Sequence, residues 1–202
     1  MKFLILQHLD IEPPALIGET LAMAGHQLST IHIDQGDTLP ASNTGFDGII
    51  IMGGPQSAND ESDYIKAELS WLKEALNQGL PMLGICLGAQ LMAKAAGSNI
   101  SASPVRELGW YPLYQTADSK DDPLFASMPE GLALFQWHGE TFSLQDKMTL
   151  VATHPDVPAQ AFRLGRGQYG LQFHIEVDAS IIETWIAHGE SECNHLGIEG
   201  IS

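Results

Sequence analysis

The stretch Gly84-Ile85-Cys86-Leu87-Gly88 follows an apolar run at residues 80–83 and precedes a helix-forming stretch at residues 89–96. A strand, a sharp turn that carries a nucleophile, and a helix in this order are typical of a nucleophile elbow. The glycines on either side of Cys86 fit this turn, because a helix that folds back tightly onto its strand leaves no space for a side chain there. The sulfur would lie at a helix N-terminus, which favours the reactive thiolate. The alternative is a buried structural cysteine, and the flanking glycines argue against it.

Composition and charge narrow the class of protein. The chain has 202 residues, enough for one α/β domain with a substantial core. Its formal net charge of −16 argues against nucleic acid or an anionic membrane as a partner. Two cysteines, Cys86 and Cys193, do not indicate a disulfide framework, and a nucleophilic thiol needs a reducing compartment. The N-terminus lacks the apolar core of a signal peptide, and no segment approaches the ~18 apolar residues of a membrane helix. We therefore expect a soluble cytoplasmic protein.

The pattern of apolar residues changes halfway along the chain. In the first half strands alternate with helices: strands are expected at residues 3–7, 27–33, 47–52 and 81–85, and helices at 15–24, 60–78 and 89–96. In the second half short strands are divided by turns, at 108–114, 133–137, 149–153, 160–163 and 169–173, before a helix at 179–187. This predicts a three-layer α/β sandwich around a mostly parallel mixed sheet, flavodoxin-like, with an antiparallel edge or subsheet. Residues 1–188 would form this domain and residues 189–202 a C-terminal tail.

A thiolate nucleophile needs a base that holds a proton and returns it to the leaving group. Among the eight histidines, His174 ends an expected strand and Glu176 follows two residues later. In a strand such residues project from the same face, so Glu176 could reach the imidazole, fix its tautomer and stabilise its charged form. A polar pair on an edge strand is the alternative. Together with the cysteine elbow, the pair predicts a Cys-His-Glu triad.

Paired glycines at the end of another strand predict the remaining catalytic element. The buried strand at residues 49–52 ends in Gly53-Gly54-Pro55, where the backbone can approach a ligand closely. Parallel-sheet enzymes bind ligands at the carboxyl ends of their strands, where this turn and the elbow would both lie. The backbone amides of Gly54 and Leu87 are therefore predicted to form an oxyanion hole.

Three separated blocks carry a resemblance to a known family. Gly53-Gly54-Pro55, Gly84-Ile85-Cys86-Leu87-Gly88-Ala89-Gln90 and Gln172-Phe173-His174-Ile175-Glu176 resemble the signature blocks of the class I (triad) glutamine amidotransferases. Two more segments, Glu107-Leu108-Gly109-Trp110 and Phe135-Gln136-Trp137-His138-Gly139-Glu140, resemble the stand-alone, guanylate-synthase-like members. The resemblance runs in the right order over residues 3–185. Relatives of the intracellular-protease type have a histidine directly after the cysteine, and Leu87 at that place argues against that branch.

The resemblance implies a role for each matched residue. Cys86 would be the nucleophile, His174 the acid and base, and Glu176 its orienting partner. The implied substrate contacts come from the turn before the oxyanion hole, from the helix after the elbow and from a separate loop: Gly53, Gln90, Trp137, His138 and Gly139. His138 is an alternative second catalytic histidine, which a complete triad does not require.

The activity implied is hydrolysis of glutamine through a γ-glutamyl thioester, with release of ammonia. The family normally passes ammonia to a synthase domain, for which a chain of this length has no room, so a separate synthase subunit is an expected partner. Two alternatives stay open: a stand-alone γ-glutamyl peptidase or hydrolase, and a catalytically quiet binding or regulatory protein, against which the complete triad argues. The histidines show no metal spacing and no Gly-rich phosphate loop occurs, so neither a metal nor another cofactor is expected. A metal site at Cys193 and His195 is less economical than a solvated tail.

Overall fold

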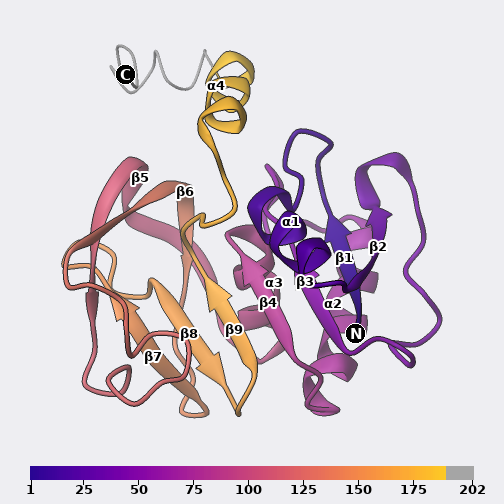
Figure 1. Ribbon diagram of the computed structural model, residues 1–202, viewed down its shortest axis with the longest axis horizontal. Helices are drawn as coiled ribbons and strands as arrows, with labels where there is room; N and C mark the ends of the chain where they lie inside the picture. The colour runs from indigo at the N-terminus through magenta and orange to yellow at the C-terminus, as the bar shows by residue number, and fades with distance from the viewer. Residues whose placement is uncertain (190–202) are drawn as a thin grey trace.

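One mixed sheet of nine strands organises the computed structural model, which describes residues 1–189. Five strands are parallel neighbours, in the order β2 (Gln27–His32), β1 (Lys2–Gln7), β3 (Gly48–Ile51), β4 (Met82–Ile85) and β9 (Gln168–Leu171). The sheet continues antiparallel through β8 (Ala161–Leu164), β7 (Met148–Thr153), β5 (Ile100–Gln115) and β6 (Leu132–Phe142). Figure 1 shows the parallel strands and the antiparallel strands as the two halves of the molecule.

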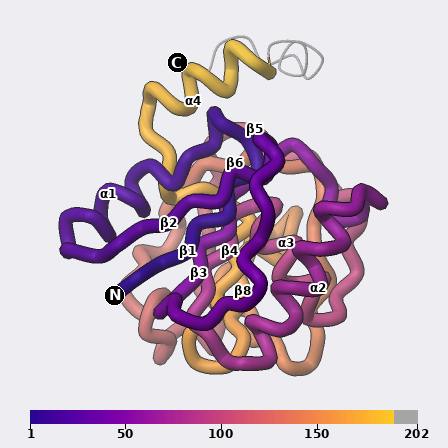
Figure 2. The backbone as a smooth tube through the Cα atoms, turned by 90° about the vertical axis from the view of Figure 1, so that its right-hand side faces the viewer, coloured from indigo at the N-terminus to yellow at the C-terminus, as the bar shows by residue number. Residues whose placement is uncertain are grey.

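Helices cover both faces of the parallel half, because its strands are apolar on both faces. Alternate residues of β1 and β3 divide between the two sides. Leu4 and Ile51 pack in a core with α2 (Asp63–Asn77) and α3 (Leu87–Ala95), whereas Ile5 packs on the other side with α1 (Ala15–Met23). Figure 2 shows α1 on one side of the strands and α2 and α3 on the other. The predicted fold, a mostly parallel mixed sheet between helical layers with an antiparallel part, is therefore confirmed.

The element bounds differ from the expected ones mainly in the second half. Strand β5 begins at Ile100 and is sixteen residues long, whereas the sequence pattern predicted its start at residue 108. Pro104 and a register shift between Ala102 and Glu107 interrupt the alternation there, so the first part of the strand has no clear two-residue pattern. A short 3₁₀ helix, η1 (Ile33–Gln35), was not predicted. Helix α4 (Ala179–His188) is one residue longer than the helix expected at residues 179–187. The expected tail at residues 189–202, with Cys193, lies outside the described residues except for Gly189.

The turn after β4 has the tight backbone conformation that the glycines on either side of Cys86 predicted. Cys86 has φ of 50° and ψ of −106°, a conformation that residues with side chains rarely adopt. A Cβ atom on Gly84 would lie 2.6 Å from the carbonyl oxygen of Gly88, and one on Gly88 would overlap the carbonyl group of Ile51 in β3. Helix α3 therefore passes so close to β3 and β4 that only glycine fits at these two positions, and this contact fixes where Cys86 lies.

Substitution of Gly88 tests this close approach. Gly88→Ala should lower the free energy of unfolding by roughly 1–3 kcal/mol, because the backbone of β3 must move away from the added methyl group. Gly167→Ala is the matched control, since its methyl group would come no closer than 3.9 Å to Pro81 and should change stability little. Denaturant unfolding followed by circular dichroism measures both. Equal midpoints for the two variants would contradict the proposed contact.

Candidate active site

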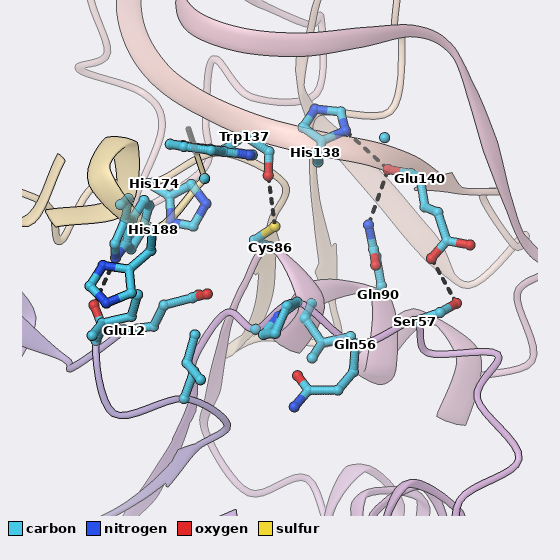
Figure 3. Close-up of a pocket in the computed structure, with 18 of the residues that line it drawn as sticks. Glu12, Gln56, Ser57, Cys86, Gln90, Trp137, His138, Glu140, His174 and His188 are labelled. Carbon is cyan, nitrogen blue, oxygen red and sulfur yellow. Dashed lines mark hydrogen bonds between the residues drawn. The ribbon is translucent and has the colours of Figure 1, made fainter. Parts of the chain in front are cut away.

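A pocket of about 800 Å³ opens at the carboxyl ends of the parallel strands. Its wall comes from the loops after β1, β3 and β4, from strand β6 and from the end of α4 (Figure 3). Eight of the ten residues predicted for the site line it: Cys86, His174, Gly54, Leu87, Gln90, Trp137, His138 and Gly139. The other two, Glu176 and Gly53, are not among the lining residues. Glu176 lies behind His174, and a methyl group built on Gly53 would lie 3.7 Å from Cβ of Cys86.

The side chain of His174 has Glu176 on one side and Cys86 on the other. Its Nδ1 lies 2.7 Å from Oε1 of Glu176, and both residues are almost fully buried. The second carboxylate oxygen, Oε2, accepts a hydrogen bond from the backbone N–H of Ile175 at 3.0 Å. On the other side the side chain of Cys86 is close enough to influence the charge of the ring, and its sulfur lies 3.7 Å from the carbonyl oxygen of Trp137 and 3.7 Å from Nε2 of Gln172. The ring of Trp185 on α4 packs edge-on against His174, with centroids 4.9 Å apart, and this holds the imidazole in place.

The reason given from the sequence for the contact between His174 and Glu176 is wrong. The two residues do not lie on one strand, because β9 ends at Leu171 and the chain bends at residues 172–176. His174 instead forms an isolated β-bridge to β6, in which its backbone N–H donates to the carbonyl oxygen of Phe135 at 2.9 Å. The bend then turns the carboxylate of Glu176 back onto the ring. The predicted contact is present, but a turn makes it rather than a strand.

Electrostatics favour the charged form of the His174 ring. Burial alone would lower the pKa of His174, since it disfavours charge. The carboxylate of Glu176 and the side chain of Cys86 act in the opposite direction and hold the pKa of His174 well above its ordinary value. These interactions favour the imidazolium form of His174, beside a sulfur at the N-terminus of α3. Such an arrangement suits proton transfer between the histidine and a nucleophile beside it.

The two amides predicted to form an oxyanion hole belong to the turn after β3 and to the first turn of α3, which meet beside Cys86. Leu87 is the first residue of α3, and the first amides of a helix have no acceptor within the helix. Gly54 follows β3, and a Cβ atom built on it would lie 2.9 Å from the side chain of Leu87. The turn after β3 is thus in contact with the start of α3, and both residues face the pocket. Their role as oxyanion donors stays a prediction.

The predicted substrate loop at Trp137, His138 and Gly139 is not a loop, because these residues lie within strand β6 and pair with β5. Polar side chains hold this strand in place at the wall of the pocket. Nε2 of Gln90 donates to the carbonyl oxygen of Glu140 at 3.0 Å and to Oε1 of Gln172 at 3.2 Å. Its own carbonyl oxygen is therefore the part that can accept a hydrogen bond from a ligand. His138 contacts Glu107 through Nε2 at 2.8 Å and the carbonyl oxygen of Glu140 through Nδ1 at 3.0 Å. Since both of its ring nitrogens are occupied, the geometry gives His138 no free nitrogen for a proton transfer at Cys86.

Sequence reasoning missed three residues near the site. Glu12, in the loop after β1, lines the pocket, and Figure 3 shows its side chain extending toward the middle of the site. A methyl group on Gly53 would touch its carboxylate and lie 3.4 Å from Cε1 of His174, so Glu12 and His174 both lie over Gly53. His8 and Glu68 form a buried pair below this loop. Two features of the sequence could have indicated this pair: His8 is a polar residue directly after β1, and Glu68 lies on the apolar face of α2.

Burial raises the pKa of Glu12 to about 7, with Glu176 adding repulsion and His174 and His8 partly offsetting it. A carboxyl whose pKa is higher in the folded state binds more protons there, so stability falls as the pH rises from about 4.5 to about 7. Glu12→Gln removes this ionisation and should stabilise the protein relative to wild type more at pH 8 than at pH 5. Thermal unfolding at both pH values measures the difference. Glu61→Gln, at an exposed carboxylate paired with Lys66, is the control, and an equal pH response of the two variants would contradict the assignment.

Residues 1–189 show neither a metal centre nor a membrane-spanning helix. In residues 1–189 no group of three or more His, Cys, Asp or Glu side chains is arranged to hold a metal ion. Within the same residues no helix combines the length and the apolar composition that crossing a membrane requires.

Known proteins resemble this chain over most of its length. The chain is 32% identical over 173 residues to the glutamine amidotransferase-like protein YfeJ of Salmonella typhimurium, covering 83% of this chain and 72% of that one. It is 37% identical over 141 residues to a glutamine-hydrolyzing GMP synthase of Porphyromonas gingivalis, covering 69% of this chain and only 26% of that longer one. A solved glutamine amidotransferase from Thermotoga maritima superposes with a TM-score of 0.90 at 30% identity, covering 98% of this chain and 86% of that one. Residues 15–187 match the glutamine amidotransferase class-I family, and the chain belongs to that family.

Proposed function

We propose that this protein hydrolyses the γ-carboxamide of glutamine, with Cys86 as the nucleophile and His174 and Glu176 as its acid–base pair. The observation that carries the proposal is the buried ring of His174, bonded to Glu176 at 2.7 Å and facing the sulfur at the elbow. The pocket around Cys86 supplies a place for the substrate. Membership of the family supports glutamine as the compound that is cleaved.

In the first half of the reaction the thiolate of Cys86 attacks the carboxamide carbon, and a carbon–sulfur bond forms. The negative charge moves to the carbonyl oxygen, where the amides of Gly54 and Leu87 donate hydrogen bonds to it. The imidazolium of His174 then gives its proton to the nitrogen, the carbon–nitrogen bond breaks and ammonia leaves. The product that stays on the enzyme is a γ-glutamyl thioester.

In the second half a water molecule takes the place of ammonia. The neutral ring of His174 accepts a proton from this water as the oxygen attacks the thioester carbon, and the same two amides again stabilise the oxyanion. The carbon–sulfur bond breaks, glutamate leaves and Cys86 returns as the thiolate beside the imidazolium. Throughout the cycle Glu176 keeps the imidazole in one orientation and stabilises its charge.

Backbone and amide groups are the proposed contacts for the rest of the substrate. The carbonyl oxygen of Trp137 lies 3.7 Å from the sulfur of Cys86, so the part of strand β6 that continues to Gly139 borders the reacting atoms. The free carbonyl oxygen of Gln90 is suited to accept a hydrogen bond from the α-ammonium group of the substrate. Gly53 contributes by the absence of a side chain, which would otherwise fill the space between Cys86 and Glu12.

A separate synthase subunit is the proposed receiver of the ammonia. The glutamine-hydrolyzing GMP synthases that the chain resembles are about four times longer than the matched part, so the likeness covers only one portion of them. By analogy, hydrolysis here would be coupled to an acceptor reaction elsewhere. A catalytic thiol requires reducing conditions, and we therefore place the reaction in the cytoplasm.

One observation favours a second candidate, a γ-glutamyl peptidase that acts alone. The pocket of about 800 Å³ is in the range that holds a drug-sized ligand, which is larger than glutamine. A longer leaving group could extend along the wall that Trp137 and His188 provide.

Kinetics of variants test the roles within the proposed triad. Cys86→Ser should abolish hydrolysis, and His174→Ala should lower kcat by on the order of 10⁴-fold or more, because it removes the proton carrier. Glu176→Gln should cost less, since it removes only the orienting charge; it should also lower the pKa of His174 and move the alkaline limb of the pH profile to lower pH. An Arg163→Met variant, at an ion pair on the opposite part of the sheet, controls for general destabilisation. A His174→Ala enzyme with nearly normal kcat would contradict the assignment.

Substrate assays distinguish the two candidate functions. Ammonia release from glutamine should be slow for the isolated protein and rise when a synthase partner binds, because free hydrolysis would waste glutamine. If the protein acts alone, γ-glutamyl peptides should be cleaved with a higher kcat/KM than glutamine. Rapid hydrolysis of glutamine by the isolated protein, with no gain from any partner and no preference for γ-glutamyl peptides, would contradict both. No hydrolysis of any γ-glutamyl compound by a folded protein would indicate a binding role instead.

A further inference from the structure

A fully buried histidine, His8, forms hydrogen bonds to the turn after β3 that carries Gly53 and Gly54. His8 directly follows β1 and has no exposed surface. Its Nδ1 lies 3.1 Å from the carbonyl oxygen of Met52 and 3.2 Å from that of Gly53. Carbonyl oxygens only accept hydrogen bonds, so Nδ1 must carry a hydrogen and donate it to both.

The opposite nitrogen of the same ring is bonded to helix α2. Nε2 of His8 lies 3.0 Å from each carboxylate oxygen of Glu68, which is also fully buried. Burial alone would lower the pKa of His8, but Glu68 and the two carbonyl groups raise it overall. The ring is therefore held between a helix and the turn. The backbone adds a further bond, since Nε2 of Gln56 donates to the carbonyl oxygen of His8 at 3.3 Å.

The bond to Gly53 determines where the next amide points. The carbonyl group of Gly53 and the N–H of Gly54 belong to one planar trans peptide unit, in which they point in opposite directions. Because the carbonyl oxygen of Gly53 points toward Nδ1 of His8, the N–H of Gly54 points away from His8. Gly54 itself faces the pocket that contains Cys86. The direction of this N–H is thus set by a side chain that does not touch the pocket.

We propose that His8, held by Glu68, is a positioning residue for the reaction: its Nδ1–H fixes the Gly53–Gly54 peptide so that the Gly54 amide is aimed at the oxyanion. This inference rests on the proposed hydrolysis and deepens it. A purely structural role would be limited to joining β1, β3 and α2. The two roles differ because the oxyanion forms only when the sulfur attacks a carbonyl group, and not in other reactions of Cys86.

Two double variants of nearly equal shape separate these roles. Both replace Glu68 with Met, which avoids an unpaired buried carboxylate. His8→Leu with Glu68→Met removes the donor, whereas His8→Asn with Glu68→Met has the same branched shape and places an amide donor near the former Nδ1. The leucine variant should lower kcat by about 100-fold or more, with little change in KM, because it loses an aligned oxyanion donor. The asparagine variant should regain at least about tenfold of that loss.

Alkylation of Cys86 by iodoacetamide distinguishes a loss of oxyanion stabilisation from general damage to the site. This reaction displaces iodide from carbon and forms no oxyanion, so its rate should be the same in the leucine variant and in wild type. Arg163→Met breaks the ion pair with the buried Asp122, and neither residue lines the pocket, so this variant shows how far general destabilisation lowers each rate. Equal kcat in the leucine and asparagine variants, or a parallel fall of kcat and alkylation, overturns the inference.

A structure of the wild-type protein keeps the inference testable if the leucine variant does not fold. With a glutamine-derived aldehyde bound to Cys86, the oxygen of the adduct should accept from the N–H of Gly54 while His8 remains bonded to the carbonyl oxygen of Gly53. A peptide turned so that this carbonyl faces the adduct overturns the inference. Wild-type protein that cleaves no γ-glutamyl compound contradicts the proposed function instead, so the two failures are distinct.

Discussion

The close contact between helix α3 and strands β3 and β4 is the constraint on which the site depends. Gly84 and Gly88 let the backbones approach to a distance that no other residue allows, and the turn between them holds Cys86 at φ of 50°. A non-glycine residue in such a conformation costs about 1–3 kcal/mol and persists only where the surroundings enforce it. Here the strained turn places the sulfur at the edge of the sheet where the parallel strands end, beside His174 and the turn after β3.

Buried pairs of histidine and carboxylate surround this strained turn. His174 contacts Glu176, His8 contacts Glu68, and Glu107 contacts His138, each pair with little or no exposed side-chain surface. Each pair joins segments distant in the chain or holds a bend, and each lies beside a backbone segment that borders the pocket. Buried ion pairs seldom increase net stability over apolar packing, but their directional bonds fix side chains and peptides in one orientation. Glu12 is a further example: its ionisation in the folded protein lowers stability, and it lies in the pocket.

The sequence predicted the features that have local causes. Periodicity and turn residues determined the order of the strands and helices, and the glycines around Cys86 indicated the elbow. The approach of His174 to Glu176 was predicted with the wrong backbone, because the bend at residues 172–176 depends on a bridge to Phe135 in β6. His8 and Glu12 were missed because their significance comes from tertiary contacts: the sequence shows polar residues after β1, but it does not show that they reach Gly53 or α2. The start of β5 was hidden by Pro104 and a bulge.

The central claim is that the sulfur in the elbow is the group that attacks a γ-glutamyl carbonyl. Reaction of the native protein with a glutamine-mimicking electrophile, followed by mass spectrometry of its peptides, tests this most directly. A single modification on the peptide that contains Cys86, formed in step with the loss of hydrolysis and prevented by excess glutamine, is the predicted result. Modification mainly at Cys193, or complete inactivation without any modification of Cys86, would contradict the claim.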